Sequence, residues 1–451
     1  MGSRLGISAP ALLAALILLC DRVQAFDPLD PEGNITLKWD IISWTSDGYQ
    51  ALVSIINYQR YRHIESPGWT LGWTWQGGEV IWGMVGAQAT YQGDCSKFHG
   101  TIPHCCLQSP TIVDLLPEAP ASMKSANCCR NGVLSSLLQD PENSVASFQL
   151  TVGQSSNASD TTSPPKSFLL GAPGPGYECS PPRRVNGSLF FTPDHRRATQ
   201  ALMTWNVTCR YSQAVAQRAP SCCVSYSAFY NATIVPCPTC ACQCSYNATQ
   251  PIQNAQPMCM QMSSAYMNSP GYSTGRTRDP PELYCSTDMC PVKIHWHVKT
   301  NYYDYWRAKL TIINRSLRKN HTQWNVVVQH PNLDNLTSAF SFNYMSLPRG
   351  RTNDTAMFWG IRFYNDELLT AGPVGNVQSE LLFQKDPSFT LDKGWAFPRR
   401  VYFNGEECVL PPPHSYPFLP SAAIHRQTLA WKALVLPVLL NMIGRNILSL
   451  F

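Results

Sequence analysis

The sequence predicts a mainly β protein with an N-terminal β-sandwich, a disulfide-rich middle segment and a second, C-terminal β-sandwich. Apolar and polar residues alternate with a period of two in several stretches, which is typical of half-buried strands. The chain has 36 prolines, as expected for β-rich modules with many turns. Eleven of the 18 cysteines lie between Cys179 and Cys290. Short helical pieces are expected at 200–204 and 212–217.

Residues 1–25 are expected to be a signal peptide. Arg4 provides a basic start, an apolar run from Ala9 to Cys20 follows, and small residues precede the expected cleavage site after Ala25. The alternative is an N-terminal membrane anchor, but the apolar run is too short to span a bilayer.

The C-terminal end predicts attachment to a lipid. A linker over 411–432 contains three small residues beginning at Ser421, and a mostly apolar tail follows over 433–451. This order is typical of a glycosylphosphatidylinositol (GPI) attachment signal, with Ser421 as the attachment residue and the tail removed. Arg445 disfavours the tail as a permanent transmembrane helix. The alternative is a terminal amphipathic helix of a soluble protein.

Cysteines and glycosylation sequons agree with a secreted protein at the outer face of the plasma membrane. Removal of Cys20 with the leader leaves an odd number of cysteines, so one is expected to be free or paired between chains unless Cys20 is retained. Ten asparagines stand in Asn-x-Ser/Thr sequons and are expected glycosylation sites: Asn34, Asn157, Asn186, Asn206, Asn231, Asn247, Asn314, Asn320, Asn335 and Asn353.

The N-terminal β-sandwich is expected over 26–165. Alternation from Ile35 to Ile41 predicts a strand, and two apolar runs, 51–58 and 80–85, predict two more. Turns are expected at Ser46-Asp47-Gly48 and at Gln76-Gly77-Gly78.

The segment 166–290 is expected to be held together by disulfides. Its cysteine motif comprises Cys222, Cys223, Cys237, Cys240, Cys242 and Cys244. This spacing could bind zinc or a cluster in the cytosol, but a signal peptide favours disulfides. Neighbouring cysteines, such as Cys128-Cys129, are expected to bridge to different partners.

The second sandwich is expected over 291–410, where an internal echo appears. Residues 39–57 align without a gap on 296–314, with identities that include Trp39/Trp296 and Asn57/Asn314. The pattern indicates a similar layout and leaves open whether the two regions arose by duplication.

Aromatic residues provide the candidate binding site. In an extended segment from Trp69 to Trp75, the side chains of Trp69, Trp73 and Trp75 share one face, about 7 Å apart between neighbours. Such a row can stack on successive sugars, with Tyr49 and Tyr58 as weaker candidates. The alternative is that these tryptophans belong to a sandwich core.

Other chemistries are disfavoured. The formal net charge of +5 comes without the clustered basic stripe that nucleic acid requires. No catalytic residues, metal site or cofactor are predicted. His295 and His297 share one strand face and could hold a metal, but no third ligand is in sight, so two surface histidines that flank a core tryptophan are favoured.

The chain closely resembles the plant COBRA and COBRA-like family, including the Brittle Culm branch. The matching strings are Asp27-Pro28-Leu29-Asp30-Pro31, Ser66-Pro67-Gly68-Trp69-Thr70, Glu79-Val80-Ile81-Trp82, Gln92-Gly93-Asp94-Cys95-Ser96, Cys222-Cys223-Val224-Ser225, His295-Trp296-His297-Val298-Lys299, His330-Pro331-Asn332-Leu333-Asp334-Asn335 and Lys393-Gly394-Trp395-Ala396-Phe397-Pro398-Arg399-Arg400.

The resemblance implies a GPI-anchored protein of the plant cell surface and wall, without established catalytic activity. It also implies an N-terminal region similar to family 2 carbohydrate-binding modules and a role in cellulose deposition, microfibril order and oriented cell expansion. The chain departs from the family at Gln76-Gly77-Gly78, where lysines are common, and at Ser421, where Asn-Gly-Gly is common.

The first hypothesis is therefore a non-enzymatic, membrane-tethered protein that binds cellulose or a related β-glucan. A wall-remodelling glycan hydrolase or transglycosylase is the second hypothesis. A surface receptor for a wall protein is the third.

Overall fold

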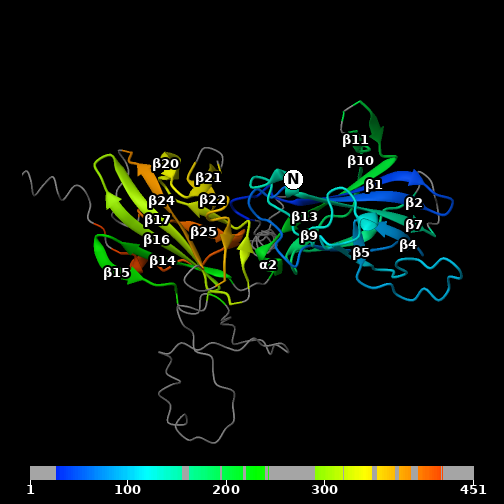
Figure 1. Cartoon of the computed structure of the whole chain (residues 1–451), viewed down its shortest axis with the longest axis horizontal. Coiled ribbons are helices and arrows are strands. Elements are labelled where there is room, and N and C mark those ends of the chain that lie inside the picture. The colour runs from blue at the N-terminus through cyan, green and yellow to red at the C-terminus, as the bar shows by residue number, and fades with distance from the viewer. Residues whose placement is uncertain are drawn as a thin grey trace, which may run out of the picture. The chain divides into compact units, whose positions relative to one another are not determined.

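A computed structural model describes residues 27–154, 162–192, 194, 196–216, 220–238, 242, 290–317, 319–347, 353–370, 375–386, 395–417 and 419. The chain forms two compact units, Met1–Arg218 (unit 1) and Ala219–Phe451 (unit 2), and the regular elements described in each are mainly β-strands (Figure 1).

Unit 1 contains a seven-stranded sheet in the order β10-β13-β1-β2-β7-β4, with β9 also pairing with β13 (Figure 1). Its strands are β1 (Ile35–Trp44), β2 (Tyr49–Asn57), β4 (Val80–Val85), β7 (Val145–Gly153), β9 (Tyr177–Cys179), β10 (Arg183–Val185) and β13 (Met203–Tyr211).

A four-stranded sheet, β5-β6-β3-β8, forms the second layer of unit 1. Its strands are β3 (Thr70–Thr74), β5 (Ala87–Ala89), β6 (Thr111–Asp114) and β8 (Lys166–Gly171). A separate hairpin joins β11 (Leu189–Phe191) and β12 (Ala198–Gln200). The short helices are the 3₁₀ turns Ala121–Met123 and Pro141–Asn143 and helix α2 (Gln213–Ala216).

The core of unit 1 is rich in tryptophan. The ring of Trp39 on β1 lies 5.1 Å from the ring of Trp73, edge to face, and Trp69 stacks on Phe148 at 5.9 Å. Trp39 and Phe148 come from the seven-stranded sheet, whereas Trp69 and Trp73 come from β3 and its N-terminal flank. These contacts join the two layers.

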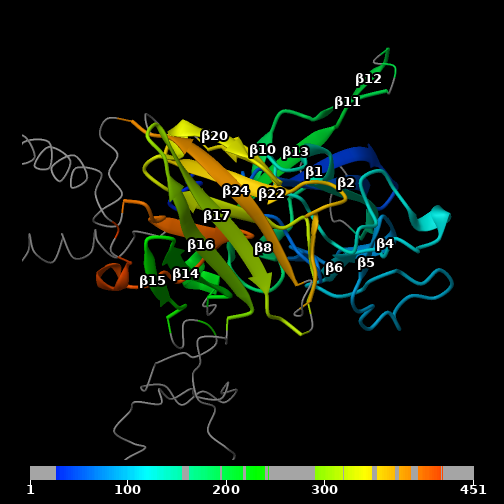
Figure 2. The ribbon, with the colours of Figure 1, turned by 60° about the vertical axis from the view of Figure 1, so that its left-hand side comes forward.

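Unit 2 contains a six-stranded sheet in the order β15-β14-β16-β17-β24-β20 (Figure 2). Its strands are β14 (Cys222–Ala228), β15 (Asn231–Val235), β16 (Val292–Asn301), β17 (Tyr305–Asn314), β20 (Leu336–Ala339) and β24 (Asn376–Gln384). All neighbours are antiparallel except β14 and β16, which are parallel.

A five-stranded sheet, β21-β22-β19-β25-β26, completes unit 2. Its strands are β19 (Asn325–Gln329), β21 (Phe342–Ser346), β22 (Thr355–Gly360), β25 (Arg400–Phe403) and β26 (Glu406–Glu407). The short strands β18 (His321–Thr322) and β23 (Glu367–Leu368) pair with each other, and 3₁₀ turns lie at Leu333–Asn335 and Pro413–Ser415.

The internal sequence similarity between 39–57 and 296–314 corresponds to two hairpins in the same register. Ile35 pairs with Asn57 in the β1–β2 hairpin, and Val292 pairs with Asn314 in the β16–β17 hairpin. Each asparagine is fully buried, and its Nδ2 donates to two backbone carbonyls. The expectation of a similar layout is therefore confirmed for these central hairpins.

Six disulfides join described cysteines: Cys95–Cys106, Cys128–Cys129, Cys179–Cys209, Cys222–Cys408, Cys223–Cys237 and Cys242–Cys290. Four members of the predicted cysteine motif are thus disulfide-bonded, while Cys240 and Cys244 lie outside the described residues. Among the described cysteines, Cys105 is free and buried. The expectation that neighbouring cysteines bridge elsewhere is wrong for Cys128 and Cys129, which bond to each other.

Two other expectations differ from the structure. The predicted separate segment 166–290 is divided in its described part, because β8 to β13 complete unit 1 whereas β14 and β15 join the sheet of unit 2. The predicted helical piece at 200–204 is wrong, because Met203 and Thr204 pair with β1. The expected piece at 212–217 matches the short helix α2.

Truncation of a core tryptophan should destabilise unit 1. We expect Trp73→Ala to lower the free energy of unfolding by about 3–5 kcal/mol, because the change opens a cavity between the layers. The matched change Tyr303→Ala should cost less than about 0.5 kcal/mol, because that ring is exposed. Urea unfolding followed by far-UV circular dichroism measures both, and equal stability of the two variants would contradict this assignment of the core.

Candidate carbohydrate-binding surfaces

The predicted tryptophan row is buried. The exposed fractions of Trp69, Trp73 and Trp75 are 1%, 1% and 2%, and that of Tyr49 is 1%. The alternation along β3 was predicted correctly, but β3 lies between β6 and β8, and its aromatic face packs against Trp39 and Phe168. The expectation of an exposed platform is therefore wrong, since rings inside a core cannot stack on a sugar.

Tyr58 differs from the other predicted candidates. It follows β2 and is 41% exposed. Its ring is accessible, so a role for Tyr58 in binding stays a prediction.

Exposed aromatic side chains gather instead at one end of the six-stranded sheet of unit 2. We call this cluster the aromatic end; its members are Phe229, Tyr230, Tyr302, Tyr303, Tyr305 and Phe340. Tyr303 is the most exposed member at 83%, and Phe229 follows at 75%.

Several contacts hold the aromatic end in place. The backbone N–H of Asn301 donates to the hydroxyl of Tyr230, and the N–H of Tyr302 donates to the carbonyl of Tyr305. The guanidinium carbon of Arg307 lies 5.7 Å from the ring centre of Tyr302 and 5.6 Å from that of Phe340. The rings therefore stand on a hydrogen-bonded turn and beside a cation.

The sequence contained a signal for this cluster. Thr45-Ser46-Asp47-Gly48, in the turn of the first hairpin, aligns with Tyr302-Tyr303-Asp304-Tyr305 in the second. A hairpin turn is exposed wherever the hairpin lies in a sheet, so tyrosines at turn positions are accessible. Tyrosines placed in such a turn are better candidates than tryptophans in phase with aliphatic residues.

A second feature of unit 2 is a chain of serine and histidine side chains on the outer face of the six-stranded sheet. The hydroxyl of Ser225 lies 2.7 Å from Nδ1 of His295, and that of Ser227 lies 2.8 Å from Nε2 of His295 and 2.7 Å from Nδ1 of His297. The chain forms because parallel pairing sets Ser225 opposite His295 and Ser227 opposite His297.

These histidines are neutral near pH 7. Burial, followed by the charges of Lys293, His297 and Lys309, lowers the pKa of His295 to about 4. Burial also lowers the pKa of His297. Neutral rings suit the hydrogen-bond chain, because the single proton of Ser227 can be donated to one ring while its oxygen accepts from the other.

Charge on the same face is predominantly positive. Lys299 forms an ion pair with Glu380, and Nη1 of Arg307 lies 3.6 Å from Oε2 of Glu380. The hydrogen bond from Lys299 is the main cause that lowers the pKa of Glu380. This carboxylate therefore stays ionised and lies between two cations.

His330 begins one of the strings that resemble the family, and it is a core residue. It is fully buried beside Trp296, Trp306 and Phe383, and burial lowers its pKa to about 3. Its Nδ1 accepts a hydrogen bond from the N–H of Asn332, so the neutral ring carries its proton on Nε2. This histidine stabilises the loop at 330–332 and is not accessible to a ligand.

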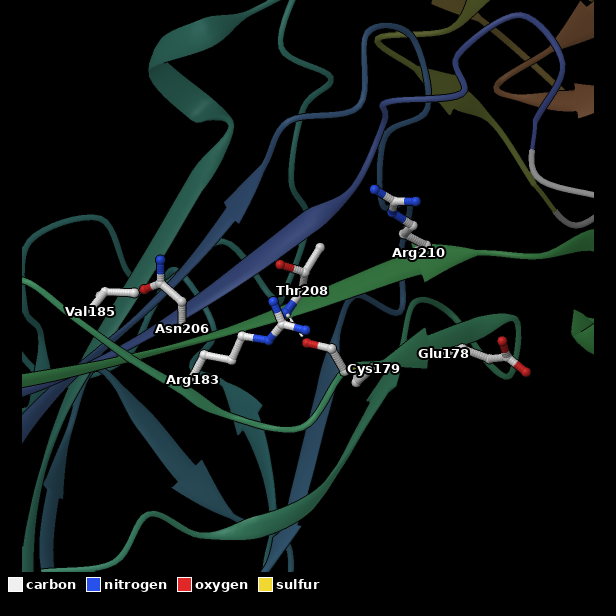
Figure 3. Close-up of a pocket in the computed structure, with 8 residues that line it drawn as sticks. Glu178, Cys179, Arg183, Val185, Asn206, Thr208 and Arg210 are labelled. Carbon is white, nitrogen blue, oxygen red and sulfur yellow. Dashed lines mark hydrogen bonds between the residues drawn. The ribbon is translucent and has the colours of Figure 1, made fainter. Parts of the chain in front are cut away.

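Unit 1 has a cavity of about 550 Å³ on β9, β10 and β13 (Figure 3). Its lining includes Glu178, Arg183, Asn206, Thr208 and Arg210. Figure 3 shows Arg183 and Thr208 close together at its centre. Asn206 and Thr208 form one of the predicted sequons, so this cavity offers space beside a site of expected glycosylation.

The other sequons differ in accessibility. Asn186, Asn320 and Asn353 are exposed, while Asn34, Asn206, Asn231 and Asn335 are partly buried. Asn157 and Asn247 lie outside the described residues. Asn314 is 0% exposed, and its Nδ2, the atom to which a glycan would attach, donates to the carbonyls of Lys319 and Leu369. The expectation of a glycan at Asn314 conflicts with this burial.

Across the described ranges, no group of three or more histidine, cysteine, aspartate or glutamate side chains is arranged to hold a metal. Within the same ranges, no helix is long and apolar enough to cross a membrane. The predicted signal peptide, the attachment residue Ser421 and the apolar tail lie outside the described residues, so they stay predictions.

The fold and these surfaces define a class of disulfide-bonded proteins with two β units. Two family models match the chain: the COBRA N-terminal domain over residues 49–212 and the COBRA family C-terminal domain over residues 221–417. The division between the two models coincides with the division between the two units. The chain belongs to the COBRA family.

Plant relatives match over almost the whole chain. COBRA-like protein 1 of Oryza sativa subsp. japonica is 57% identical over 423 residues, which cover 93% of this chain and 93% of that protein. Protein COBRA of Arabidopsis thaliana is 57% identical, with 92% and 91% covered. A solved structure, a GH20 exo β-N-acetylglucosaminidase from Vibrio harveyi, covers 29% of this chain and 19% of its own at 9% identity, and its TM-score of 0.21 supports no argument.

Acidification should destabilise the protein through its buried histidines. Unfolded histidine has a pKa near 6.5, whereas His295 and His330 have much lower pKa values when folded. Below about pH 6.5 the unfolded chain therefore binds protons that the folded chain does not, and the free energy of unfolding should fall by about 1.4 kcal/mol per pH unit for each such group.

Urea unfolding between about pH 7 and pH 5 measures this slope. The variant His295→Gln should show a shallower slope than the unaltered protein. A control, His99→Gln, removes a histidine on an exposed loop of unit 1 and should leave the slope unchanged. Identical slopes for all three proteins would contradict the neutral, buried state of His295.

Glycosylation should avoid Asn314. We expect peptide mapping of the secreted protein by mass spectrometry to find Asn314 unmodified, because a glycan replaces one of the two Nδ2 hydrogens, breaks a buried hydrogen bond and has no space beside a side chain that is 0% exposed. Asn57 makes the same pair of bonds in unit 1 without being in a sequon, which shows that this role is structural. Asn353, which is exposed, provides the comparison, and a glycan found on Asn314 would contradict the described packing.

Proposed function

We propose that this protein is a non-enzymatic cell-surface protein that binds cellulose or a related β-glucan. By binding, it modulates the assembly of cellulose microfibrils, the organisation of the wall and the oriented expansion of the cell. Membership of the COBRA family supports a role in cellulose deposition and oriented expansion. The structural observation that carries the proposal is the aromatic end of unit 2.

The aromatic end has the features that glucan binding needs. A pyranose ring has apolar C–H faces that stack on aromatic rings, while its hydroxyls point sideways towards polar partners. Tyr302, Tyr303 and Tyr305 provide the rings, and their hydroxyls can bond to the sugar edges. The polar side chain of Asp304 lies within the same turn. Tyr58 is a second candidate contact, in unit 1.

Tethering strengthens such an interaction. We propose that a lipid at Ser421 holds the protein in the outer leaflet of the plasma membrane, facing the wall. A binder fixed at a surface has a high effective concentration for polymers that emerge there, so a weak contact is sufficient. The partners in this proposal are the glucan and the lipid leaflet, and nucleic acid is not among them.

The described residues favour binding over catalysis. Ser225 and His295 resemble a nucleophile and base in distance, but Ser225 is 0% exposed and cannot reach a substrate. The pKa of Asp30 is raised by burial, as a catalytic acid requires, but its carboxylate accepts a hydrogen bond from the N–H of Arg60. Asp30 therefore has a structural role.

Removal of the turn tyrosines should abolish binding to cellulose. We expect crystalline cellulose to deplete the secreted protein from solution, and the double variant Tyr302→Ala/Tyr303→Ala to remain in solution because the stacking surface is lost. Stacking contributes about 0.5–1.5 kcal/mol per ring, so the loss of two rings should weaken binding by about 5-fold to 150-fold. Amorphous cellulose and xylan, tested in parallel, report the preferred polymer.

A matched control removes two exposed rings elsewhere on unit 2. Phe363 and Tyr364 are 88% and 73% exposed and lie in the turn after β22. The variant Phe363→Ala/Tyr364→Ala should bind cellulose like the unaltered protein. Equal depletion of the tyrosine variant and of this control would overturn the assignment of the aromatic end, and no depletion of the unaltered protein by any glucan would overturn the proposed function.

A further inference from the structure

The outer face of the six-stranded sheet of unit 2 has a strong excess of positive charge. Its six strands contain four lysine or arginine residues, Lys293, Lys299, Arg307 and Lys309, and a single acidic residue, Glu380. Alternation sets all five on the face opposite the core, since Val292, Ile294, Trp296 and Val298 point inwards. The four cations lie on the two central strands, β16 and β17, and form an array.

The fold does not require this charge. The first hairpin has the same register, and its residues at the positions of Lys293, Lys299 and Lys309 are Thr36, Ile42 and Leu52. A hairpin with neutral side chains at these positions therefore adopts the same register in unit 1. The cations of unit 2 need an explanation other than stability.

Glu380 does not neutralise the array. It pairs with Lys299 and Arg307 together, which leaves one positive charge in excess at that point. Lys309 lies opposite both His297 and Glu380 in the register, and Lys293 lies two positions before His295 on the same face. The proximity of Lys293 and Lys309 contributes to the lowered pKa of His295, which agrees with a positive potential over the centre of the face.

Uncharged hydrogen-bonding groups lie among the cations. His295 and His297 are linked through Ser227, and Thr311 and Gln378 lie opposite each other on β17 and β24. Neighbouring strands are about 4.8 Å apart, and alternate residues along a strand about 7 Å. The face thus offers repeated positive and polar contacts at distances suited to an extended polymer.

We infer that this face binds an acidic polysaccharide whose sugars carry carboxylates. The carboxylates of a polyuronate match the lysines and Arg307, and its hydroxyls match the side chains of Thr311 and Gln378. A polysaccharide is favoured over other polyanions because the cations adjoin the aromatic end, where Arg307 lies beside Tyr302 and Phe340 and pyranose rings can stack. The inference concerns a second polymer and a face that adjoins the proposed glucan site at Arg307.

The test uses the full-length secreted protein and polygalacturonate in buffer without divalent cations, with binding measured by affinity electrophoresis. Methyl-esterified polygalacturonate provides the same backbone without charge. We expect binding to the acid form, weakening as salt rises, and at least tenfold weaker binding to the ester, because the recognition is electrostatic. Equal binding to the acid and the ester would overturn the inference.

Two variants with the same loss of charge locate the site. Lys293→Gln/Lys309→Gln should weaken binding to polygalacturonate by about tenfold. Lys38→Gln/Lys166→Gln, in unit 1, should leave it unchanged, and circular dichroism with urea unfolding confirms that both variants fold. An equal loss in the two variants would show that only net charge matters and would overturn the site.

Two further measurements separate this inference from other outcomes. Depletion by crystalline cellulose should be the same for the Lys293→Gln/Lys309→Gln variant as for the unaltered protein, because these lysines are not among the proposed glucan contacts. Binding to polygalacturonate is measured separately, so it can be detected even when the protein does not bind cellulose. Vesicles that contain anionic lipid test a membrane surface, which is another polyanion that a basic protein face can bind. Binding to such vesicles without binding to polygalacturonate would replace the polysaccharide with a membrane surface and overturn the inference.

Discussion

The pairing of two strands in one fixed register is the constraint on which both units depend. In each unit a hairpin alternates core and outer residues, and a buried asparagine closes the open end of the hairpin, opposite its turn, through two hydrogen bonds to backbone carbonyls. A shift of one residue would turn Trp39 or Trp296 towards the solvent and bring polar residues into the core. The closed register therefore separates the side chains that build the core from those that are available for binding.

Much of the fold could be predicted from the sequence because period-two alternation is a local signal. The strand β1 was predicted from it, and β2 and β4 were predicted from apolar runs of strand length. The side chains that share a face from Trp69 to Trp75 follow from the same alternation. The sequence could not show which face of β3 is covered, because that depends on the seven-stranded sheet that faces it, whose strand β7 (Val145–Gly153) lies more than 70 positions further along the chain. Trp69, Trp73 and Trp75 were assigned to the surface for that reason.

The candidate sites could also be predicted only in part, because some of their contacts join residues that are distant in the sequence. The strings that contain Ser225 and His295 could each be recognised, but their contact arises from the parallel pairing of β14 with β16, two strands separated by more than 60 residues. The aromatic end combines three turns that are distant in the sequence. Only the tyrosines within one turn, from Tyr302 to Tyr305, could have been identified as exposed from local context.

The disulfide between Cys222 and Cys408 has a mechanical consequence. It connects β14, in the six-stranded sheet, to a residue near the end of the described chain. If the protein is held by its C-terminus while its surface grips a polymer, tension enters unit 2 from that end. The covalent bridge passes the load directly to β14, so pulling can extend only the residues after Cys408 and cannot unzip β25 and β26 one hydrogen bond at a time. With the proposed anchor and ligand, unit 2 bears force along the line that joins them.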